Sequence, residues 1–420
     1  MRFDWSKVST RAEALARPRG RDDATLREAV GRIVDDVRTR GWKGLVEQAV
    51  RIDGRPPTAL GVAPFAAAAR RALPVEAQDA MQLAARNIAV FHQQTLPRDI
   101  EVAILPGLSV AKQWRPLTRV GLYVPGGRAP LFSTLLMLAI PARVAGVKEV
   151  VVVTPPRAEG GLDPAVALAA ELAGIDTIWE VGGAQAIAAL AFGAGDIPAV
   201  DRICGPGNAW VSQAKSIVAA RPGGPGIDLP AGPSELMIIA DDSANPATVA
   251  ADMLSQAEHD SDAQVLLVSS SSSVIDAVEG AFHGQAASIG GAYAPARFIH
   301  CANLDEAVAI ANAYAPEHLS LACEGAAGMV AAVQNAGAIF VGHQAAESFG
   351  DYLAGSSHVL PTDGAARFTG GVSTLTFMKA ITVQQVAADA AAALAAPAAA
   401  LARLEGLEAH ARAADARSAA

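Results

Sequence analysis

The spacing of apolar residues predicts a helical region near the N-terminus. Between residues 24 and 92, apolar side chains recur every three or four positions, which places them on one face of a helix. In the first such helix this face comprises Leu26, Val30, Ile33, Val34 and Val37. After Pro97 the chain changes to short apolar alternations separated by glycine and proline, a pattern typical of strands and turns. We therefore expect a domain boundary near residue 115.

From residue 116 to 380, strand-like and helix-like segments alternate in two successive series. The strand-like segments are short apolar runs such as EVVVVT at 149–154 and ELMIIA at 235–240. Such alternation is typical of parallel α/β sheets covered by helices. We predict an α/β protein with two Rossmann-like domains, at 116–230 and 231–380, whose sheets are incomplete and mostly parallel. A helical N-terminal region at 1–115 and a helical C-terminal region at 381–420 flank them.

The C-terminal region is rich in alanine. Its pattern predicts two helices broken at Pro397, because proline removes a backbone donor and clashes with the preceding turn. The low complexity by itself is typical of a mere tail. The presence of His410 in this region argues against that interpretation.

The charge balance narrows the classes of partner. The chain has 33 basic and 42 acidic residues, a formal net charge of -9, which argues against nucleic acid or an anionic membrane and favours a small-molecule substrate. The N-terminus lacks the apolar run of a signal peptide. The most apolar stretch, Leu131 to Val144, is interrupted by Pro141 and Arg143 and is shorter than the roughly 18 residues of a membrane span. We expect a cytoplasmic protein with no membrane partner.

Cysteine usage points to a reducing compartment. Cys204, Cys301 and Cys323 are too few and too scattered for a disulfide framework or a thiolate zinc site. Cys204 adjoins a glycine turn, where a stabilised thiolate could act as a nucleophile in aldehyde oxidation. No histidine or lysine adjoins it, so a buried small side chain is the favoured interpretation.

Three clusters could carry chemistry. In SQAEH, Gln256 and His259 are three residues apart on a predicted helix and share a face, where an amide oxygen and an imidazole suit Zn²⁺. In APEHL, Glu317 and His318 could serve two proton-transfer positions around one substrate. For each of these pairs, an ordinary polar helix surface or helix start is the alternative.

The third cluster is a glycine-rich segment at 347–362. Here Asp351 is a candidate metal ligand, and His358 is a candidate contact either to a metal-binding side chain or to the substrate. Both could equally be turn residues that bond their own backbone.

Three glycine turns lie at 123–127, 181–185 and 204–208, and the second follows a predicted strand. The second opens a helix, where backbone N–H groups can receive a phosphate of a nucleotide. None of the three matches the full G-x-G-x-x-G fingerprint, so purely structural turns remain the alternative.

Taken together, the motifs resemble the histidinol dehydrogenase family. They are GLYVPGGRAPLFSTLLMLAIPARVAGV, VGGAQAIAALAFG, GPGNAWVSQAK, GIDLPAGPSE, SQAEHD, APEHL, GDYLAGSSHVLPT and EGLEAH, in one order from about residue 25 to 412. The resemblance implies oxidation of L-histidinol through L-histidinaldehyde to L-histidine with two NAD⁺, the last step of histidine biosynthesis. It also implies an intertwined homodimer with shared active sites and one Zn²⁺ per site.

The same resemblance assigns roles residue by residue. It implies Gln256, His259, Asp351 and, from the other subunit, His410 as zinc ligands. It implies His318 as the general base in both hydride transfers and Glu317 as the group that activates water. NAD would lie beside Tyr123, Gln185 and Asn208. The substrate contacts would be Ser234, Gln256, His259, His318, Asp351, His358, Glu405 and His410.

One departure leaves the substrate open. Lys379 is followed by Ala380, where family members have a Lys-Arg pair. A paralogous NAD-dependent dehydrogenase of another small polar alcohol, such as an amino alcohol or a sulfonated diol, is therefore an alternative. A catalytically silent zinc-binding or scaffold protein is a third. The presence of Glu405 and His410 favours histidinol.

Overall fold

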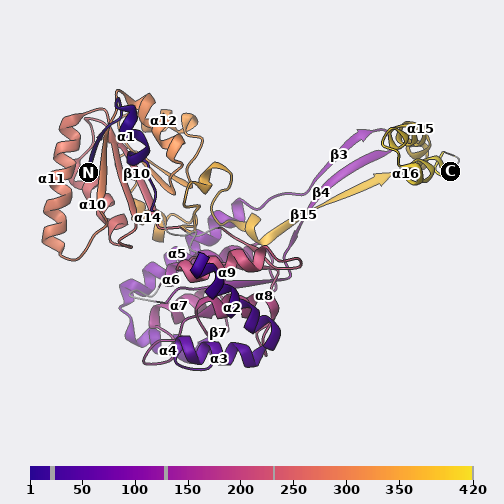
Figure 1. The fold of residues 1–420 in the computed structure, drawn as a ribbon, viewed down its shortest axis with the longest axis horizontal. Coiled ribbons are helices and arrows are strands. Elements are labelled where there is room, and N and C mark those ends of the chain that lie inside the picture. The colour runs from indigo at the N-terminus through magenta and orange to yellow at the C-terminus, as the bar shows by residue number, and fades with distance from the viewer. Residues whose placement is uncertain (19–23, 127–130, 230–231, 419–420) are drawn as a thin grey trace. The chain divides into compact units, whose positions relative to one another are not determined.

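The structure is a computed structural model of the full chain, and it describes residues 1–18, 24–126, 131–229 and 232–418. The chain divides into two compact units. Unit 1 comprises Met1–Gln94 and Thr118–Phe377, and unit 2 comprises Thr95–Leu117 and Met378–Ala420. Figure 1 labels the helices and strands of both units.

The first sheet of unit 1 has six strands in the order β2-β7-β6-β5-β8-β9. The strands are β2 (Thr58–Gly61), β5 (Arg119–Tyr123), β6 (Glu149–Thr154), β7 (Thr177–Glu180), β8 (Arg202–Cys204) and β9 (Gly226–Ile227). Only the pairing of β2 with β7 is antiparallel. The chain leaves β5 toward β6 on one side and later returns to β8 on the other, so the topological switch point lies between β5 and β8.

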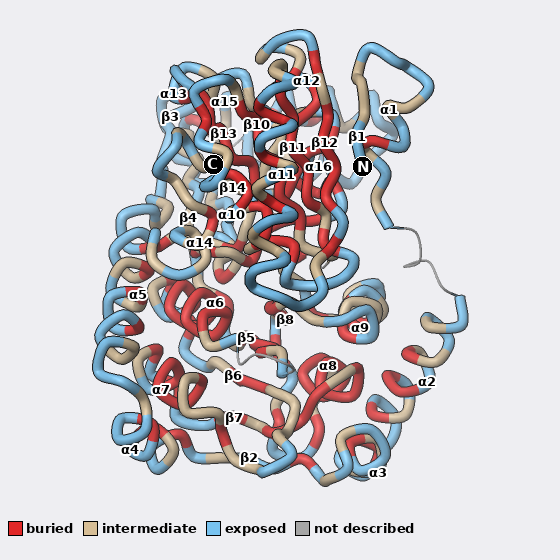
Figure 2. Tube along the Cα trace, turned by 90° about the vertical axis from the view of Figure 1, so that its left-hand side faces the viewer, coloured by how far each residue is buried: buried red, intermediate tan, exposed pale blue. Residues whose placement is uncertain are grey.

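Helices cover both faces of this sheet, and Figure 2 shows their buried sides turned toward it. The covering helices are α2 (Ala24–Arg40), α3 (Trp42–Asp53), α4 (Val62–Ala72), α5 (Val75–Gln94), α6 (Phe132–Val144), α7 (Pro164–Leu172), α8 (Gly183–Phe192) and α9 (Ala209–Ala219). The predicted stripe in α2 is confirmed, because Val30, Ile33, Val34 and Val37 are all buried. Helix α6 is buried on all sides, which fits its almost uniformly apolar sequence.

The second sheet of unit 1 is entirely parallel and has the order β1-β12-β11-β10-β13-β14. Its strands are β1 (Arg2–Asp4), β10 (Glu235–Ala240), β11 (Gln264–Ser269), β12 (Ala296–His300), β13 (His318–Ala322) and β14 (Ala338–Val341). Its central strand β10 is buried along its whole length, with Ile238 in the core on one face and Ile239 in the core on the other. The second switch point lies between β10 and β13.

The remaining elements of unit 1 connect these strands. They are α1 (Val8–Ala14), α10 (Pro246–Ala257), α11 (Ser272–Ile289), α12 (Leu304–Tyr314), α13 (Ala326–Met329), α14 (Glu347–Tyr352) and the short 3-10 turns at Val330–Ala332, Ala365–Arg367 and Thr374–Phe377. The two mostly parallel sheets confirm the predicted α/β class. Within the described ranges, no helix combines the length and apolar character needed to cross a membrane.

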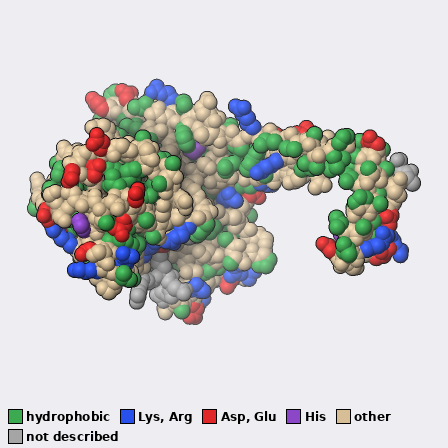
Figure 3. Space-filling view, turned by 90° about the horizontal axis from the view of Figure 1, so that it is seen from above, with side chains coloured by type: hydrophobic (Ala, Val, Ile, Leu, Met, Phe, Trp, Pro, Cys, Tyr) green, Lys and Arg blue, Asp and Glu red, His purple; other side chains and the backbone are tan. Residues whose placement is uncertain are grey.

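Unit 2 is a three-stranded antiparallel sheet with two helices. The order is β15-β4-β3, from β3 (Ile100–Leu105), β4 (Leu108–Pro116) and β15 (Met378–Val386), followed by α15 (Ala388–Leu404) and α16 (Glu408–Asp415). The C-terminal region at 381–420, predicted as helical, therefore begins within strand β15. Figure 3 shows many hydrophobic side chains on the visible surface of this unit. The exposed ones include Ile100, Val102, Ile104, Ile381, Val386, Leu401 and Leu404.

The predicted break at Pro397 is wrong. Helix α15 continues through Pro397, and the break falls at Gly406, which has a φ of 74°. Glycine adopts this left-handed conformation at little cost and commonly ends helices. The two predicted helices therefore exist, but they meet nine residues further along.

Candidate active site

One pocket of unit 1 is lined by residues from both sheet systems. On one side it meets the amino ends of β10 and β13, represented by Ser234 and His318. On the other side it meets Gly205 and Pro206, at the carboxyl end of β8. The pocket therefore lies at the carboxyl edge of the first sheet and at the amino edge of the second.

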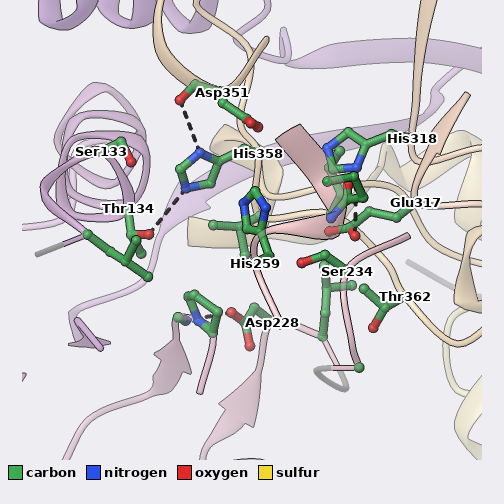
Figure 4. Close-up of a pocket in the computed structure, with 18 of the residues that line it drawn as sticks. Ser133, Thr134, Asp228, Ser234, His259, Glu317, His318, Asp351, His358 and Thr362 are labelled. Carbon is green, nitrogen blue, oxygen red and sulfur yellow. Dashed lines mark hydrogen bonds and ion pairs between the residues drawn. The ribbon is translucent and has the colours of Figure 1, made fainter. Parts of the chain in front are cut away.

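Seven of the residues predicted from the sequence line this pocket. They are Ser234, Gln256, His259, Glu317, His318, Asp351 and His358. They come from segments that are separated by up to about 120 residues, and Figure 4 shows six of them, all but Gln256, labelled around the same space. The fold thus collects the three chemical clusters that the sequence shows as separate motifs.

Gln256 and His259 do not both lie on the predicted helix. Helix α10 ends at Ala257, and His259 follows it, with Nδ1 donating to the carbonyl of Ser255 at 2.8 Å. This bond leaves Nε2 as the ring's lone-pair nitrogen. The Gln256 side chain is fully buried, and neither its oxygen nor its nitrogen has a hydrogen-bond partner. An unpaired buried amide is costly, so this group is suited to a bound ligand.

His318 is the first residue of β13 and is buried. Its Nδ1 donates to the backbone carbonyl of Glu235 at 3.1 Å, which makes Nε2 the proton acceptor. Burial lowers the pKa of His318 from 6.5 to about 4, and the nearby Asp351 charge opposes that shift. The imidazole is therefore neutral near pH 7.

Glu317 lies directly before β13 and is also buried. Its Oε2 accepts the backbone N–H of Glu235 at 2.9 Å. Burial raises its pKa well above 4.5, against that hydrogen bond. The turn that delivers Glu317 passes through Ala315, which caps α12 in a left-handed conformation with a φ of 56°.

Asp351 lies in helix α14, not in the predicted glycine-rich loop. His358 follows in irregular structure, and both of its ring nitrogens are engaged. Nδ1 donates to the backbone carbonyl of Asp351 at 3.1 Å, and Nε2 faces the hydroxyl of Thr134 at 3.2 Å (Figure 4). His358 therefore ties the Asp351 segment to α6, and its direct contact with substrate stays a prediction.

Glu347, a buried pocket residue in the first turn of α14, was not predicted as a site residue from the sequence. Its Oε1 lies 3.3 Å from Nδ1 of His318, although neither carboxylate oxygen forms a hydrogen bond. Burial raises the pKa of Glu347 well above 4.5. Its position four residues before Asp351, one helical turn away, is the signal that could have identified it.

A buried ion pair also lines the pocket and was missed. Lys215 and Asp228 pair with each other, and both bind the backbone of Gly205. Asp228 accepts the Gly205 N–H at 2.6 Å, and Lys215 donates to the Gly205 carbonyl at 3.0 Å. The pair fixes the β8–α9 turn at the edge of the pocket.

The predicted NAD contacts lie at the carboxyl edge of the first sheet. The Tyr123 hydroxyl accepts the N–H of Gly183 at 3.2 Å, and Asp53 accepts the N–H of Gly182 at 3.1 Å. These bonds engage the N–H groups of Gly182 and Gly183, which the sequence predicts as donors to a phosphate. Gln185 donates to Asp53 at 3.0 Å, but its buried Oε1 has no partner.

Asn208, the third predicted NAD contact, is exposed and caps helix α9. Its side-chain oxygen accepts from the N–H groups of Trp210 and Val211. Gly127, in the first glycine turn, lies outside the described residues.

Glu405 and His410 belong to unit 2, where both are exposed. Across the parts of the chain that the structure describes, no three His, Cys, Asp or Glu side chains are grouped so as to hold a metal. Of the predicted zinc ligands, the unit 1 pocket contains two with side chains of these types, His259 and Asp351, together with the Gln256 amide.

The three cysteines are free and buried, and burial raises the pKa of Cys204 well above 9.0. The burial of Cys204 confirms its interpretation as a small buried side chain.

Comparisons with known proteins agree with this arrangement. The family model described as histidinol dehydrogenase matches residues 16–418. A histidinol dehydrogenase of Xanthomonas axonopodis pv. citri (strain 306) is 46% identical over 98% of this chain and 97% of its own length. One from Legionella pneumophila subsp. pneumophila is 42% identical over 99% and 97%. The crystal structure of histidinol dehydrogenase from Elizabethkingia anophelis has a TM-score of 0.93 at 35% identity, covering 99% of this chain and 97% of that one. The chain belongs to the histidinol dehydrogenase family of oxidoreductases.

Proposed function

We propose that this protein oxidises L-histidinol through L-histidinaldehyde to L-histidine, with two NAD⁺ and a site zinc ion. The observation that carries the proposal is the convergence of a buried imidazole, a buried carboxyl group and an unpaired buried amide on one pocket, from His318, Glu317 and Gln256. Alcohol oxidation requires a base for the hydroxyl proton, and aldehyde oxidation requires the addition of water. The pocket contains a residue for each requirement.

His318 is the proposed general base. Its hydrogen bond to Glu235 holds the proton on Nδ1 and directs the lone pair to Nε2. Because burial keeps the ring neutral, Nε2 can accept the hydroxyl proton of histidinol and later a proton of the hydrated aldehyde. The Glu347 carboxyl group lies beside Nδ1, where an ionised carboxylate would stabilise the imidazolium that forms.

Glu317 is the proposed activator of water. Its Oε2 is held by the N–H of Glu235, which leaves Oε1 to orient and deprotonate a water molecule. Its raised pKa makes it a stronger base than an ordinary glutamate. Attack of that water on the aldehyde gives a gem-diol, so no covalent adduct with Cys204 is needed.

The donor set fits zinc. The unpaired Gln256 amide, the Nε2 of His259 and the Asp351 carboxylate are the nitrogen and oxygen ligands that zinc accepts. The Nδ1 bond to Ser255 orients the His259 ring as metal-bound histidines are commonly oriented. When bound, zinc would anchor the imidazole and amino groups of histidinol. His410 of the partner subunit is the proposed fourth ligand.

The unpaired Oε1 of Gln185 supports a dinucleotide site at the carboxyl edge of the first sheet. Tyr123, Gln185 and Asn208 would hold NAD⁺, which would accept the hydride. Ser234, which lines the pocket, and Glu405 are proposed substrate contacts.

The apolar surface of unit 2 supports a homodimer with shared sites. Exposed Ile100, Val102 and Ile104 alternate along β3, and such a sheet face is commonly covered by a partner. We also propose a cytoplasmic location, with neither nucleic acid nor membrane as partner.

The test is the yield and metal dependence of NADH. Limiting L-histidinol should yield two NADH per molecule, and a chelator should abolish turnover until zinc is restored. Turnover of a different amino alcohol or of a sulfonated diol, with histidinol inert, would assign the chain to a paralogous dehydrogenase. Binding of zinc without turnover of any alcohol would contradict catalysis.

A further inference from the structure

The backbone of a single residue, Glu235, contacts both proposed proton-transfer residues. The backbone N–H of Glu235 donates to Oε2 of Glu317 at 2.9 Å, and the backbone carbonyl of Glu235 accepts from Nδ1 of His318 at 3.1 Å. Glu235 opens β10, and the next residue, Leu236, pairs in register with His318 of β13. The position of the Glu235 backbone therefore sets the orientation of the Glu317 carboxyl group and the tautomer of His318.

The side chain of Glu235 is fully buried and is held from two directions. Arg17 donates to it through a two-pronged contact, Nε to Oε1 at 2.5 Å and Nη2 to Oε2 at 2.9 Å. The backbone N–H of Asp363 donates to Oε1 at 3.1 Å. The planar guanidinium matches a carboxylate in this geometry, which an ammonium group cannot reproduce.

Arg17 also contacts the turn that precedes Glu317 and His318. Its Nη2 donates to the carbonyl of Tyr314 at 2.8 Å, and its guanidinium carbon lies 3.9 Å from the centre of the Tyr314 ring. Tyr314 ends α12, and only Ala315 and Pro316 separate it from Glu317. One guanidinium thus joins the strand that anchors Glu317 and His318 to the turn that carries them.

Neither Arg17 nor Glu235 is among the described residues that line the pocket. Burying an ion pair commonly gives little net stability over an apolar pair of the same size, so stability alone is a weak reason for this one. Fixing geometry is a better reason, because small displacements of a catalytic group are costly.

We propose that Arg17 and Glu235 are positioning residues that hold Glu317 and His318 in their proton-transfer geometry through the Glu235 backbone and the Tyr314–Ala315 turn. This inference rests on the proposed function for its kinetic readout. It identifies a role for the N-terminal segment that precedes α2 and supplies none of the proposed zinc, NAD or substrate contacts.

The kinetic test compares two partly buried arginines. Arg17→Met should lower kcat by about 10²-fold, as expected for a misplaced catalytic group. The KM for histidinol and the zinc content should stay unchanged. The kcat of Arg17→Lys should lie between those of the parent protein and Arg17→Met. The control is Arg119→Met, since Arg119 is also partly buried, pairs with Glu149 and binds the carbonyl of Ala199, away from Glu235, Glu317, His318 and Tyr314. Equal losses of kcat in the two methionine variants would mean that Arg17 is merely structural.

A double-variant comparison tests whether Arg17 acts through the catalytic pair. In a Glu317→Gln/His318→Gln background, Arg17→Met should cause little further loss of the residual rate, because the groups it positions are already disabled. A full additional 10²-fold loss would overturn the proposal. If Arg17→Met does not fold, the same comparison is made with Arg17→Lys.

A spectroscopic readout separates this inference from the proposed function. In protein with nitrogen-labelled histidine, the His318 signals, assigned by their loss in His318→Gln, should show the Nδ1–H tautomer in the parent protein and mixed tautomers in Arg17→Met. This result in a protein inactive toward histidinol would refute the function and keep the positioning role. An active parent whose Arg17→Met variant has the same kcat and the same tautomer would refute the positioning role alone.

Discussion

At the scale of single residues, burial shifts the pKa values of His318 and Glu317 in opposite directions. It lowers the pKa of the imidazole to about 4 and raises that of the carboxyl group well above 4.5. As pH falls, the carboxylate therefore gains its proton earlier than an ordinary glutamate, whereas the imidazole stays a free base below its usual pKa of 6.5.

The two oxidations should consequently differ in pH dependence. For histidinol as substrate, kcat/KM should persist below pH 6.5 and decline toward about pH 4, because only neutral His318 accepts the proton. For histidinaldehyde as substrate, the decline should begin at higher pH, because Glu317 must be ionised. Stopped-flow measurement of each oxidation as a function of pH gives the pH at which each rate declines. Coincident declines near pH 6.5 would mean that His318 titrates as an exposed histidine.

Substitution should separate the same two roles. His318→Gln should lower kcat for both steps by about 10²- to 10⁴-fold, the usual contribution of a general base. Glu317→Gln should slow aldehyde oxidation to a similar degree and leave histidinol oxidation much less affected. Single-turnover NADH formation from each substrate measures this, with zinc content determined as the control. Equal loss of both steps in Glu317→Gln would assign Glu317 to proton transfer in general.

Residues of the pocket were predictable where short motifs contain their chemistry. Gln256, His259, Glu317 and His318 fall in such motifs, and the structure brings them to one pocket. Glu347 was missed because an acidic residue at a helix start has an ordinary stabilising role. Arg17 was missed because its partner Glu235 lies 218 positions away, and no local pattern connects the two.

At the scale of elements, close packing between a turn and a strand fixes the edge of the pocket. Gly205 has a φ of 125°, and a Cβ added there would lie 2.1 Å from the carbonyl oxygen of Tyr123, at the end of β5. Only glycine fits without moving a strand end.

Gly205→Ala should therefore destabilise the protein by about 1–3 kcal/mol and reduce turnover, because the Lys215–Asp228 pair holds this turn against the pocket. Gly280→Ala is the matched control. Gly280 lies in α11 with no atom within 4 Å of an added Cβ, so alanine should stabilise the helix by roughly 0.5–1 kcal/mol. Urea unfolding measures both. An unchanged midpoint for Gly205→Ala would show that the turn can relax.

Elements with a strong periodic or uniformly apolar pattern were predictable, as in α2, β6 and β10. The errors arose where tertiary packing overrides local preference. Pro397 is accommodated inside α15, and the glycine-containing segment around Gly350 forms helix α14. Strand β1 has only three residues, and its pairing with β12, nearly 300 positions away, gives no sequence signal.

At the scale of the whole molecule, catalysis by the proposed mechanism requires two chains. The pocket of unit 1 offers three of the four proposed zinc ligands, and His410 is an exposed residue of unit 2. The parallel α/β plan was predictable from alternating segments. The antiparallel sheet of unit 2 was not, because β4 and β15 lie some 260 residues apart.

Mixing two inactive variants tests this dependence. His259→Ala and His410→Ala should each abolish turnover, whereas subunit exchange between them should restore about one quarter of the parent activity, since half of the dimers would contain one intact site of two. Light scattering should show dimers throughout. Full activity of His410→Ala would remove His410 from the site, and absence of recovery despite verified exchange would contradict shared sites.

The two edges that meet at the pocket present opposite ends of their helices. Helix α10 finishes at Ala257, so its macrodipole places partial negative charge beside His259. Helix α9 starts three residues beyond Pro206, so its macrodipole places partial positive charge on the facing side. The helix dipoles therefore favour positive charge near His259 and negative charge near Pro206, each by a modest amount of about 0.3–1 kcal/mol.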